Sequence, residues 1–175
     1  NPIPGTCVTV VMEGSRPLVA EVQALIDPTS PGTSRRITNG LTPARVAMAL
    51  AVLERRVGIG LKSHDAYVST VGGMRISEPA ADLAVVVAAT TALSGRNMTT
   101  PAVAIGEVGL AGDVRQVTGV PQRLAQAARL GFSHAIVPAG SASATSGMVV
   151  TEVSTLAEAL AAVIQVPLDR PIVLS

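Results

Sequence analysis

The chain has 175 residues, of which 48% are hydrophobic and 14% are charged, and its formal net charge is +1. This length predicts one globular domain whose core is large enough to need neither a metal nor a disulfide. A near-neutral total excludes bulk attraction to a polyanion but permits a local basic patch. With one tyrosine, one phenylalanine and no tryptophan, the chain also lacks the aromatic platform on which many nucleic-acid modules stack bases.

The cysteine count and the hydropathy of the sequence indicate the compartment in which the protein works. Cys7 is the single cysteine, which excludes an internal disulfide and a cysteine-rich zinc site. This usage is typical of a reducing compartment, so we expect a cytoplasmic location. The sequence shows neither a signal peptide nor an apolar run of membrane-spanning length, and no membrane partner is expected. Because the chain begins with Asn1 rather than methionine, we expect a fragment of a longer protein.

The first part of the chain predicts a strand pair, a loop and a helix. Residues Thr6–Gly14 and Pro17–Ile26 are rich in β-branched and aliphatic residues on either side of a turn, a pattern typical of two antiparallel strands. Residues 27–41 contain two prolines and two glycines and predict a flexible loop. A helix is expected to begin after a cap at Thr42 and to run to about Val57.

Strands and helices alternate through the rest of the chain. Leu83–Ala89 is apolar on every side and predicts a central, covered helix. The predicted order is β-β-α-β-α-β-α-β-β-α, which belongs to the α/β (α+β) class with helices packed on a mixed sheet. The later strands are expected at residues 66–71, 102–110, 134–137 and 148–153, with 102–110 as either one strand or a strand pair. The later helices are expected at 78–94, 118–130 and 155–164.

Familiar catalytic and cofactor motifs are not found in the sequence. There is no G-x-S-x-G elbow, no Walker-type phosphate loop and no G-x-G-x-x-G before a helix. His64 and His134 could serve a triad only with an acid such as Asp65 or Asp82, and their positions at strand starts favour structural roles. The two separated histidines match no metal-ligand spacing, and Cys7 is expected to pack as a small hydrophobe.

Four acids near helix starts or strand ends are a further candidate cluster. Glu78, Asp82, Glu107 and Asp113 are expected to cap helices or to complement helix dipoles. A catalytic carboxylate pair among them is the alternative interpretation.

Arginine is the feature that remains, since twelve of the thirteen basic residues are arginines and Lys62 is the other. Six arginines lie between residues 35 and 75, where they would either form a solvated surface or grip phosphate groups through bidentate contacts. The candidate phosphate contacts are Arg35, Arg36, Arg45 and Arg75, followed by Arg55, Arg56, Arg115 and Arg123.

Four long segments resemble the Lon-protease-like domain found at the carboxy terminus of the RadA (Sms) family of bacterial DNA repair proteins. The segments are GTCVTVVMEGSRPLVAEVQALI, RRITNGLTPARVAMALAVLERRVGIGL, HDAYVSTVGGMRISEPAADLAVVVA and GEVGLAGDVRQVTGVPQRLAQAARLGFSHAIVP. The resemblance implies one Lon proteolytic-domain-like fold over residues 1–175, with its core at about 5–165. In that family a zinc finger and a RecA-like ATPase precede this domain, so zinc and ATP are expected there and no cofactor or metal is expected here.

The resemblance also implies that this domain is noncatalytic. Lon-type peptidases use a serine–lysine dyad, and the matching positions here are Ala80 and Pro121. Alanine has no nucleophilic atom and proline has no amine that could act as a base. Lys62 lies between the first helix and the next strand, where it is not expected to serve that site. The full-length protein is expected to be a DNA-dependent ATPase.

The leading hypothesis is a noncatalytic scaffold and DNA-binding domain. It would bind DNA through backbone phosphates by the eight arginines and self-associate into a ring, expected to be hexameric, that supports ATP-driven branch migration. The resemblance leaves room for a RecA-type recombinase as a partner. Two alternatives stay open: a serine peptidase with a displaced site, using Ser77 or a nearby serine, and a pure oligomerisation module.

Overall fold

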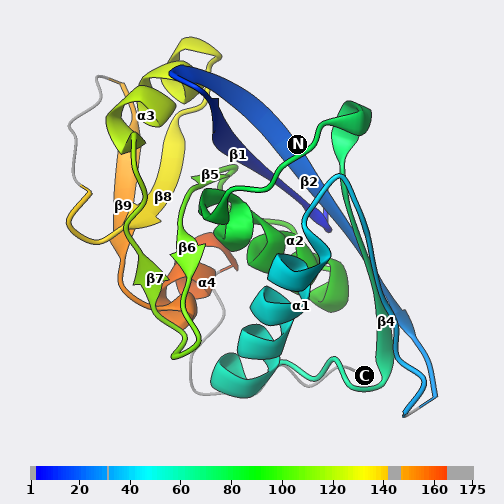
Figure 1. Cartoon of the computed structure of the whole chain (residues 1–175). Coiled ribbons are helices and arrows are strands. Elements are labelled where there is room, and N and C mark those ends of the chain that lie inside the picture. Colours follow the sequence, from blue (N-terminus) through cyan, green and yellow to red (C-terminus); the bar gives the residue numbers. More distant parts are fainter. Residues whose placement is uncertain (1–2, 31, 142–146, 165–175) are drawn as a thin grey trace.

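A seven-stranded mixed sheet forms the centre of the protein (Figure 1). The computed structural model describes residues 3–30, 32–141 and 147–164. The order of the strands across the sheet is β3-β4-β2-β1-β5-β8-β9. The β1–β2 and β2–β4 pairs are antiparallel, and the other neighbours are parallel. The strands are β1 (Thr6–Glu13), β2 (Arg16–Pro28), β3 (Arg36–Asn39), β4 (His64–Thr70), β5 (Val103–Ala104), β8 (His134–Pro138) and β9 (Val149–Val153).

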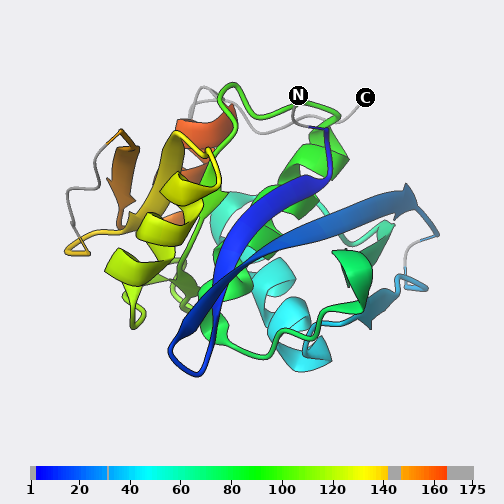
Figure 2. The ribbon, with the colours of Figure 1, turned by 90° about the horizontal axis from the view of Figure 1, so that it is seen from above.

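Helices cover both faces of this sheet, as the α/β class predicts. α1 (Pro43–Val52) continues into a wider π-turn, η1 (Leu53–Val57), and packs with α2 (Asp82–Ser94) and α4 (Leu156–Ile164) on one face. α3 (Val120–Arg129) packs on the other face. Seen from above, the β1–β2 hairpin crosses between α3 on one side and α1 and α2 on the other (Figure 2).

Alternation along the strands divides the apolar side chains between the two layers. Cys7 and Val11 of β1 lie in the core beneath α2, whereas Val8 and Val10 lie against the α3 side. The same alternation places Ala104 of β5 in the first core and its neighbours in the second. Successive side chains of a strand point to opposite faces, so a strand buried on both sides is apolar throughout.

α2 is the most enclosed element, which confirms the prediction of a central helix. Every residue from Asp82 to Thr91 is buried, and the helix packs on β1 and β2 and beside α1 and α4. Gly95 ends the helix in a left-handed conformation that costs glycine little. A short 3₁₀ turn, η3 (Pro79–Ala81), leads into its first residue. A helix that is apolar on all sides is stable only when it is covered in this way.

The structure corrects the prediction of a loop over residues 27–41 at both ends. β2 extends to Pro28, and β3 pairs in parallel with β4, so that Ile37 lies opposite Tyr67. β3 was not predicted because it is a four-residue edge strand with one apolar residue and no buried position, so it shows little apolar pattern. Leu41 then bridges Ile76, which ties the end of this segment to the chain after β4.

The predicted chain order also lacks a small hairpin. The expected strand or strand pair at residues 102–110 consists of two strands, β5 and β6 (Glu107–Val108). β6 pairs with β7 (Val114–Arg115), a strand that the sequence did not predict, in a separate two-stranded sheet. Strands of two residues are too short to show a periodic pattern. Residues 142–146 of the predicted polar connection between β8 and β9 lie outside the described residues.

One part of the sheet is not covered by any helix of the described residues. α3 covers the β1, β5 and β8 side of its face, whereas Leu25, Tyr67 and Ile37 are register partners farther along the same face. Leu25 is 62% exposed and Ile37 is 45% exposed. In the part of the chain that the structure describes, no helix is both long and apolar enough to cross a membrane.

The core contains one hydroxyl whose removal should stabilise the fold. Thr9 of β1 is fully buried, and its Oγ1 has no hydrogen-bond partner within the described residues. Thr9→Val keeps the shape but removes this unpaired group, so the free energy of unfolding should rise by about 1–2 kcal/mol in urea denaturation. Thr90→Val is the matched control, because the Thr90 hydroxyl is also buried but donates to the Val86 carbonyl at 2.8 Å. A loss of stability in Thr9→Val would contradict this assignment.

Candidate functional site

The two positions matched to the dyad carry no reactive group. Ala80 lies in η3, almost fully buried in the core on the α3 side, and its carbonyl accepts a hydrogen bond from the Gly106 amide at 2.9 Å. Pro121 is exposed in the first turn of α3, where its fixed φ and missing amide hydrogen suit a helix start. Neither side chain can attack a carbonyl or accept a proton.

An ion pair joins residues near these two positions in the chain, the partly buried Glu78 and the buried Arg123. The Arg123 side chain is 1% exposed and its two terminal nitrogens contact the Glu78 carboxylate, one of them at 3.2 Å. Its guanidinium also donates to the carbonyls of Val10, at 2.7 Å, and Thr118, at 3.0 Å. The Met12 amide donates to the same carboxylate at 3.1 Å. This network joins β1, the entry to α2 and the start of α3, and it removes Arg123 from any phosphate contact.

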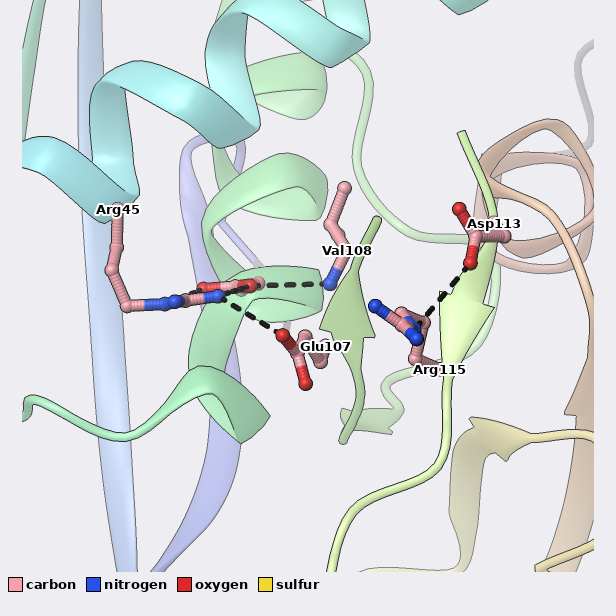
Figure 3. A network of polar contacts seen from close by, with 6 residues as sticks. Arg45, Glu107, Val108, Asp113 and Arg115 are labelled. Carbon is pink, nitrogen blue, oxygen red and sulfur yellow. Dashed lines mark hydrogen bonds and ion pairs between the residues drawn. The ribbon is translucent and has the colours of Figure 1, made fainter. Parts of the chain in front are cut away.

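A second arginine is held in the same way at the start of α2. Arg45 of α1 donates to both oxygens of the Asp82 carboxylate, at 3.0 and 2.6 Å, and approaches Glu107 at 3.7 Å (Figure 3). The Val108 amide donates to Asp82 at 3.1 Å. A bidentate guanidinium–carboxylate pair of this kind is geometrically specific. Arg45 therefore joins α1 to α2 and to the β6–β7 hairpin.

Burial sets the electrostatics of this pair. Burial raises the pKa of the Asp82 carboxyl, against the opposing effect of the hydrogen bonds from Arg45 and from the Val108 amide. The hydrogen bond to Asp82 raises the pKa of Arg45 in turn, so the guanidinium stays charged. The carboxylate is thus expensive to bury and depends on Arg45 for its compensation.

Glu78 and Asp82 make no side-chain capping bond at the starts of η3 and α2, so the predicted caps are wrong at these two positions. Asp82 does lie in the first turn of α2, where a negative charge complements the helix dipole as the sequence also predicted. Both carboxylates pair with arginines, Glu78 with Arg123 and Asp82 with Arg45. The partners are 45 and 37 residues away in the chain. No local spacing predicts such pairs.

The remaining candidate arginines do not meet in one place. Arg35 and Arg36 lie at the start of β3, beside the start of β4, whereas Arg75 follows the opposite end of β4. Arg55 and Arg56 lie in η1, and the Arg56 Nε donates to the Leu110 carbonyl at 3.2 Å. The sequence cluster at 35–75 is therefore divided between two ends of the sheet.

Arg36 is partly engaged within the protein. Its guanidinium donates to the carbonyls of His64 at 2.7 Å and Leu61 at 3.1 Å, as well as to its neighbour Arg35. Arg115 on β7 is 64% exposed and faces Asp113 at 3.8 Å, a solvated pair that contributes little to stability (Figure 3). Within the described residues, the guanidinium groups of Arg35, Arg55 and Arg75 make no hydrogen bond or ion pair.

A polar groove of about 440 Å³ lies at the Arg75 end of the sheet. The segment between β3 and α1 forms one wall, and the segment after β4 forms the other. The Ile76 amide donates to the Gly40 carbonyl at 2.7 Å and holds the walls together. The lining residues are Thr38, Asn39, Gly40, Leu41, Thr42, Pro43, Gly73, Arg75, Ile76 and Ser77.

The structure brings no nucleophile and base together in this region. Ser77 lines the groove, but Lys62 precedes β4, whose seven residues separate it from the groove. At about 3.3 Å per residue this strand spans roughly 20 Å, far beyond hydrogen-bond reach. Cys7 packs in the core as expected, and burial raises the pKa of its thiol to about 12, so no thiolate is available at neutral pH.

The histidines likewise form no catalytic or metal cluster in the residues that the structure describes. His134 Nδ1 lies 2.9 Å from the hydroxyl of Ser133, while His64 Nδ1 is buried without a hydrogen-bond partner. Asp65 accepts the Arg35 amide at 2.7 Å rather than a histidine proton. No group of three or more potential metal ligands occurs in residues 3–30, 32–141 and 147–164.

The fold and the site define an α/β domain whose predicted dyad positions are chemically inert and flanked by two buried ion pairs. The chain is 49% identical over 158 residues to the DNA repair protein RadA of Mycolicibacterium smegmatis, covering 90% of this chain and 34% of that protein. It is 48% identical over 160 residues to RadA of Mycobacterium tuberculosis H37Rv, covering 91% of this chain and 33% of that protein. For RadA of Bacillus subtilis the identity is 43% over 159 residues, with coverages of 89% and 35%.

This chain is therefore homologous to a segment of the RadA DNA repair proteins, which confirms the resemblance found in the sequence. It spans about a third of the length of these curated relatives. A family model described as "Subunit ChlI of Mg-chelatase" also matches residues 70–141, which include η3, α2, α3 and β8.

The buried pair of Glu78 and Arg123 generates a test of its structural role. Glu78→Gln leaves the buried guanidinium without its counter-charge, so the free energy of unfolding should fall by about 3 kcal/mol. Urea denaturation measures the change, with the exposed Glu13→Gln as the matched control. Replacing both partners, as Glu78→Leu with Arg123→Met, should recover most of the loss. If Glu78→Gln and wild type have equal free energies of unfolding, the pair does not stabilise the fold and the assigned structural role is wrong.

Proposed function

We propose that this chain is a noncatalytic scaffold and DNA-binding domain of a RadA-type DNA repair protein. The observation that carries the proposal is the 49% identity over 158 residues to a protein named DNA repair protein RadA. The chain corresponds to only about a third of such proteins, so its contribution is that of one domain within a longer machine. We assign the fold to the Lon proteolytic-domain type on the basis of the sequence resemblance.

The absence of peptidase chemistry is part of the proposal. Ala80 and Pro121 cannot act as nucleophile and base, and the space between η3 and α3 is crossed by the Glu78–Arg123 pair. Nothing in the surroundings of Ser77 supports a displaced catalytic site, because Lys62 lies at the far end of β4. The domain would therefore act as a noncatalytic scaffold that positions its DNA-binding residues.

DNA binding is assigned to a basic end of the molecule. The end of α1–η1 and the start of β4 both lie at the lower edge in Figure 1. Glu54, Asp27 and Asp65 reduce the charge of this edge but do not cancel it. The basic end consists of Arg35, Arg36, Arg55, Arg56 and Lys62.

Contacts at this end would be made to backbone phosphates. Guanidinium and ammonium groups without base-reading partners carry no sequence information, so binding should be independent of sequence and should weaken with salt. Arg45 and Arg123 are not included, because their guanidinium groups are paired with the carboxylates of Asp82 and Glu78. Arg115 remains a proposed peripheral contact.

Self-association is the second part of the scaffold role. The exposed apolar residues Leu25 and Ile37 on the uncovered sheet face support an association of copies, since exposed apolar patches often mark interfaces. A ring, expected to be hexameric, would place several DNA-binding surfaces around one axis. ATP hydrolysis, zinc binding and branch migration are assigned to the remainder of the full-length protein in the cytoplasm, with a RecA-type recombinase as a further proposed partner.

The test of DNA binding uses Arg35 and Arg55, whose guanidinium groups make no hydrogen bond or ion pair within the described residues. Arg35→Ala with Arg55→Ala should lower the affinity of the 175-residue chain for a short duplex and reduce the slope of log K against log salt by about 2. Fluorescence anisotropy across a salt series measures both quantities. Arg129→Ala, at the exposed end of α3, is the matched control and should change neither. Unchanged binding in the double variant would remove the basic end from the interface.

A further inference from the structure

The groove at the Arg75 end is separate from the basic end and has a chemistry of its own. Three hydroxyl side chains line it, those of Thr38, Thr42 and Ser77. Arg75 is the charged residue of the lining, and no carboxylate belongs to it. The apolar lining residues Leu41 and Ile76 are buried, so their side chains add little to the exposed surface.

The nearest carboxylates do not neutralise Arg75. A smaller adjoining cavity contains Glu78 and Asp82 and shares Leu41, Thr42, Ile76 and Ser77 with the groove. Glu78 is paired with Arg123, and Asp82 is paired with Arg45. Each negative charge beside the groove is therefore matched by a guanidinium inside the protein. Arg75 is left as an uncompensated positive charge at the groove.

The walls of the groove are fixed in place. Gly40 has a φ of +80°, and a Cβ there would collide with the Thr70 hydroxyl and the Met74 carbonyl. The Thr70 hydroxyl donates to that same carbonyl, and Ile76 donates to Gly40 across the two walls. A site with fixed walls loses little conformational entropy when a ligand binds.

We infer that this groove binds a backbone phosphate of a DNA strand, held by the Arg75 guanidinium and by the hydroxyls of Thr42 and Ser77. The inference rests on the proposed DNA-binding function and adds a second contact point to it. A guanidinium can contact two phosphate oxygens at once, and hydroxyls donate to the same group. The lining has no aromatic residue, so it would hold the backbone rather than stack a base.

The position of the groove determines the length of strand that reaches both contact points. The basic end lies at the start of β4 and the groove follows its other end, seven residues later. At about 3.3 Å per residue the two points are roughly 20 Å apart. In duplex DNA one strand rises by about 3.4 Å per nucleotide along the helix axis, and an extended single strand spaces its phosphates about twice as far apart, so this separation needs about four consecutive phosphates of a single strand. An oligonucleotide of four nucleotides has only three internucleotide phosphates and cannot occupy both.

The experiment compares wild type, Arg75→Ala and the Arg129→Ala control in fluorescence anisotropy with labelled dT12, labelled dT4 and a 12-base-pair duplex. Arg75→Ala should weaken dT12 binding about fivefold or more and reduce the salt slope by about 0.7, whereas on dT4 it should differ from wild type by less than twofold. The measurement with the duplex shows whether Arg75 also contributes to the binding of double-stranded DNA. Arg75 is exposed and makes no contact within the described residues, so unchanged circular dichroism and melting are expected.

Two results would overturn the inference, and they differ in what they leave standing. If Arg75→Ala binds dT12 and duplex like wild type while Arg35→Ala with Arg55→Ala weakens both, the groove is not a phosphate site and the basic end stands. If wild type binds none of the three probes at low salt, the proposed DNA-binding function fails together with the groove. An equal loss on dT4 and dT12 would contradict the two-point span.

Discussion

The buried helix α2 can exist only if the carboxylates at its entrance are neutralised. Its first residue, Asp82, and the residue before η3, Glu78, bring two negative charges to the edge of an apolar core. Arg45 from α1 and Arg123 from α3 supply the opposite charges from the two faces of the sheet. Removing one partner of such a pair leaves a buried charge without compensation, which is among the most costly changes a core can undergo.

This constraint also separates the candidate arginines into structural ones and ones whose side chains face solvent. Arg45 and Arg123 are structural, and Arg36 is partly so through its bonds to the carbonyls of Leu61 and His64. Arg35, Arg55 and Arg75 keep their guanidinium groups toward solvent. Among these candidates, Arg35 and Arg75 lie at opposite ends of β4 instead of forming one patch.

Much of the fold could be predicted because it follows local patterns. The alternation in β1 and β2, the uniform apolar surface of α2 and the helix starts at Pro43 and Pro79 are all visible in neighbouring residues. β3 and the β6–β7 hairpin could not be predicted, because strands of four and two residues carry too little pattern. The arginine–carboxylate pairs join residues 37 and 45 apart, and only tertiary packing brings them together. Sequence reasoning therefore grouped the arginines into one cluster, although they have different roles in the structure.

Arginine side-chain NMR during a DNA titration tests the central claim most directly, because each Nε–H signal reports its own guanidinium. The ¹⁵N-labelled chain would be titrated with dT12 at low salt. The account predicts that the signals of Arg35, Arg55 and Arg75 shift, while those of Arg45 and Arg123 stay where they are, held by Asp82 and Glu78. Shifts at Arg45 or Arg123, or no shift at Arg35, Arg55 and Arg75, would contradict it.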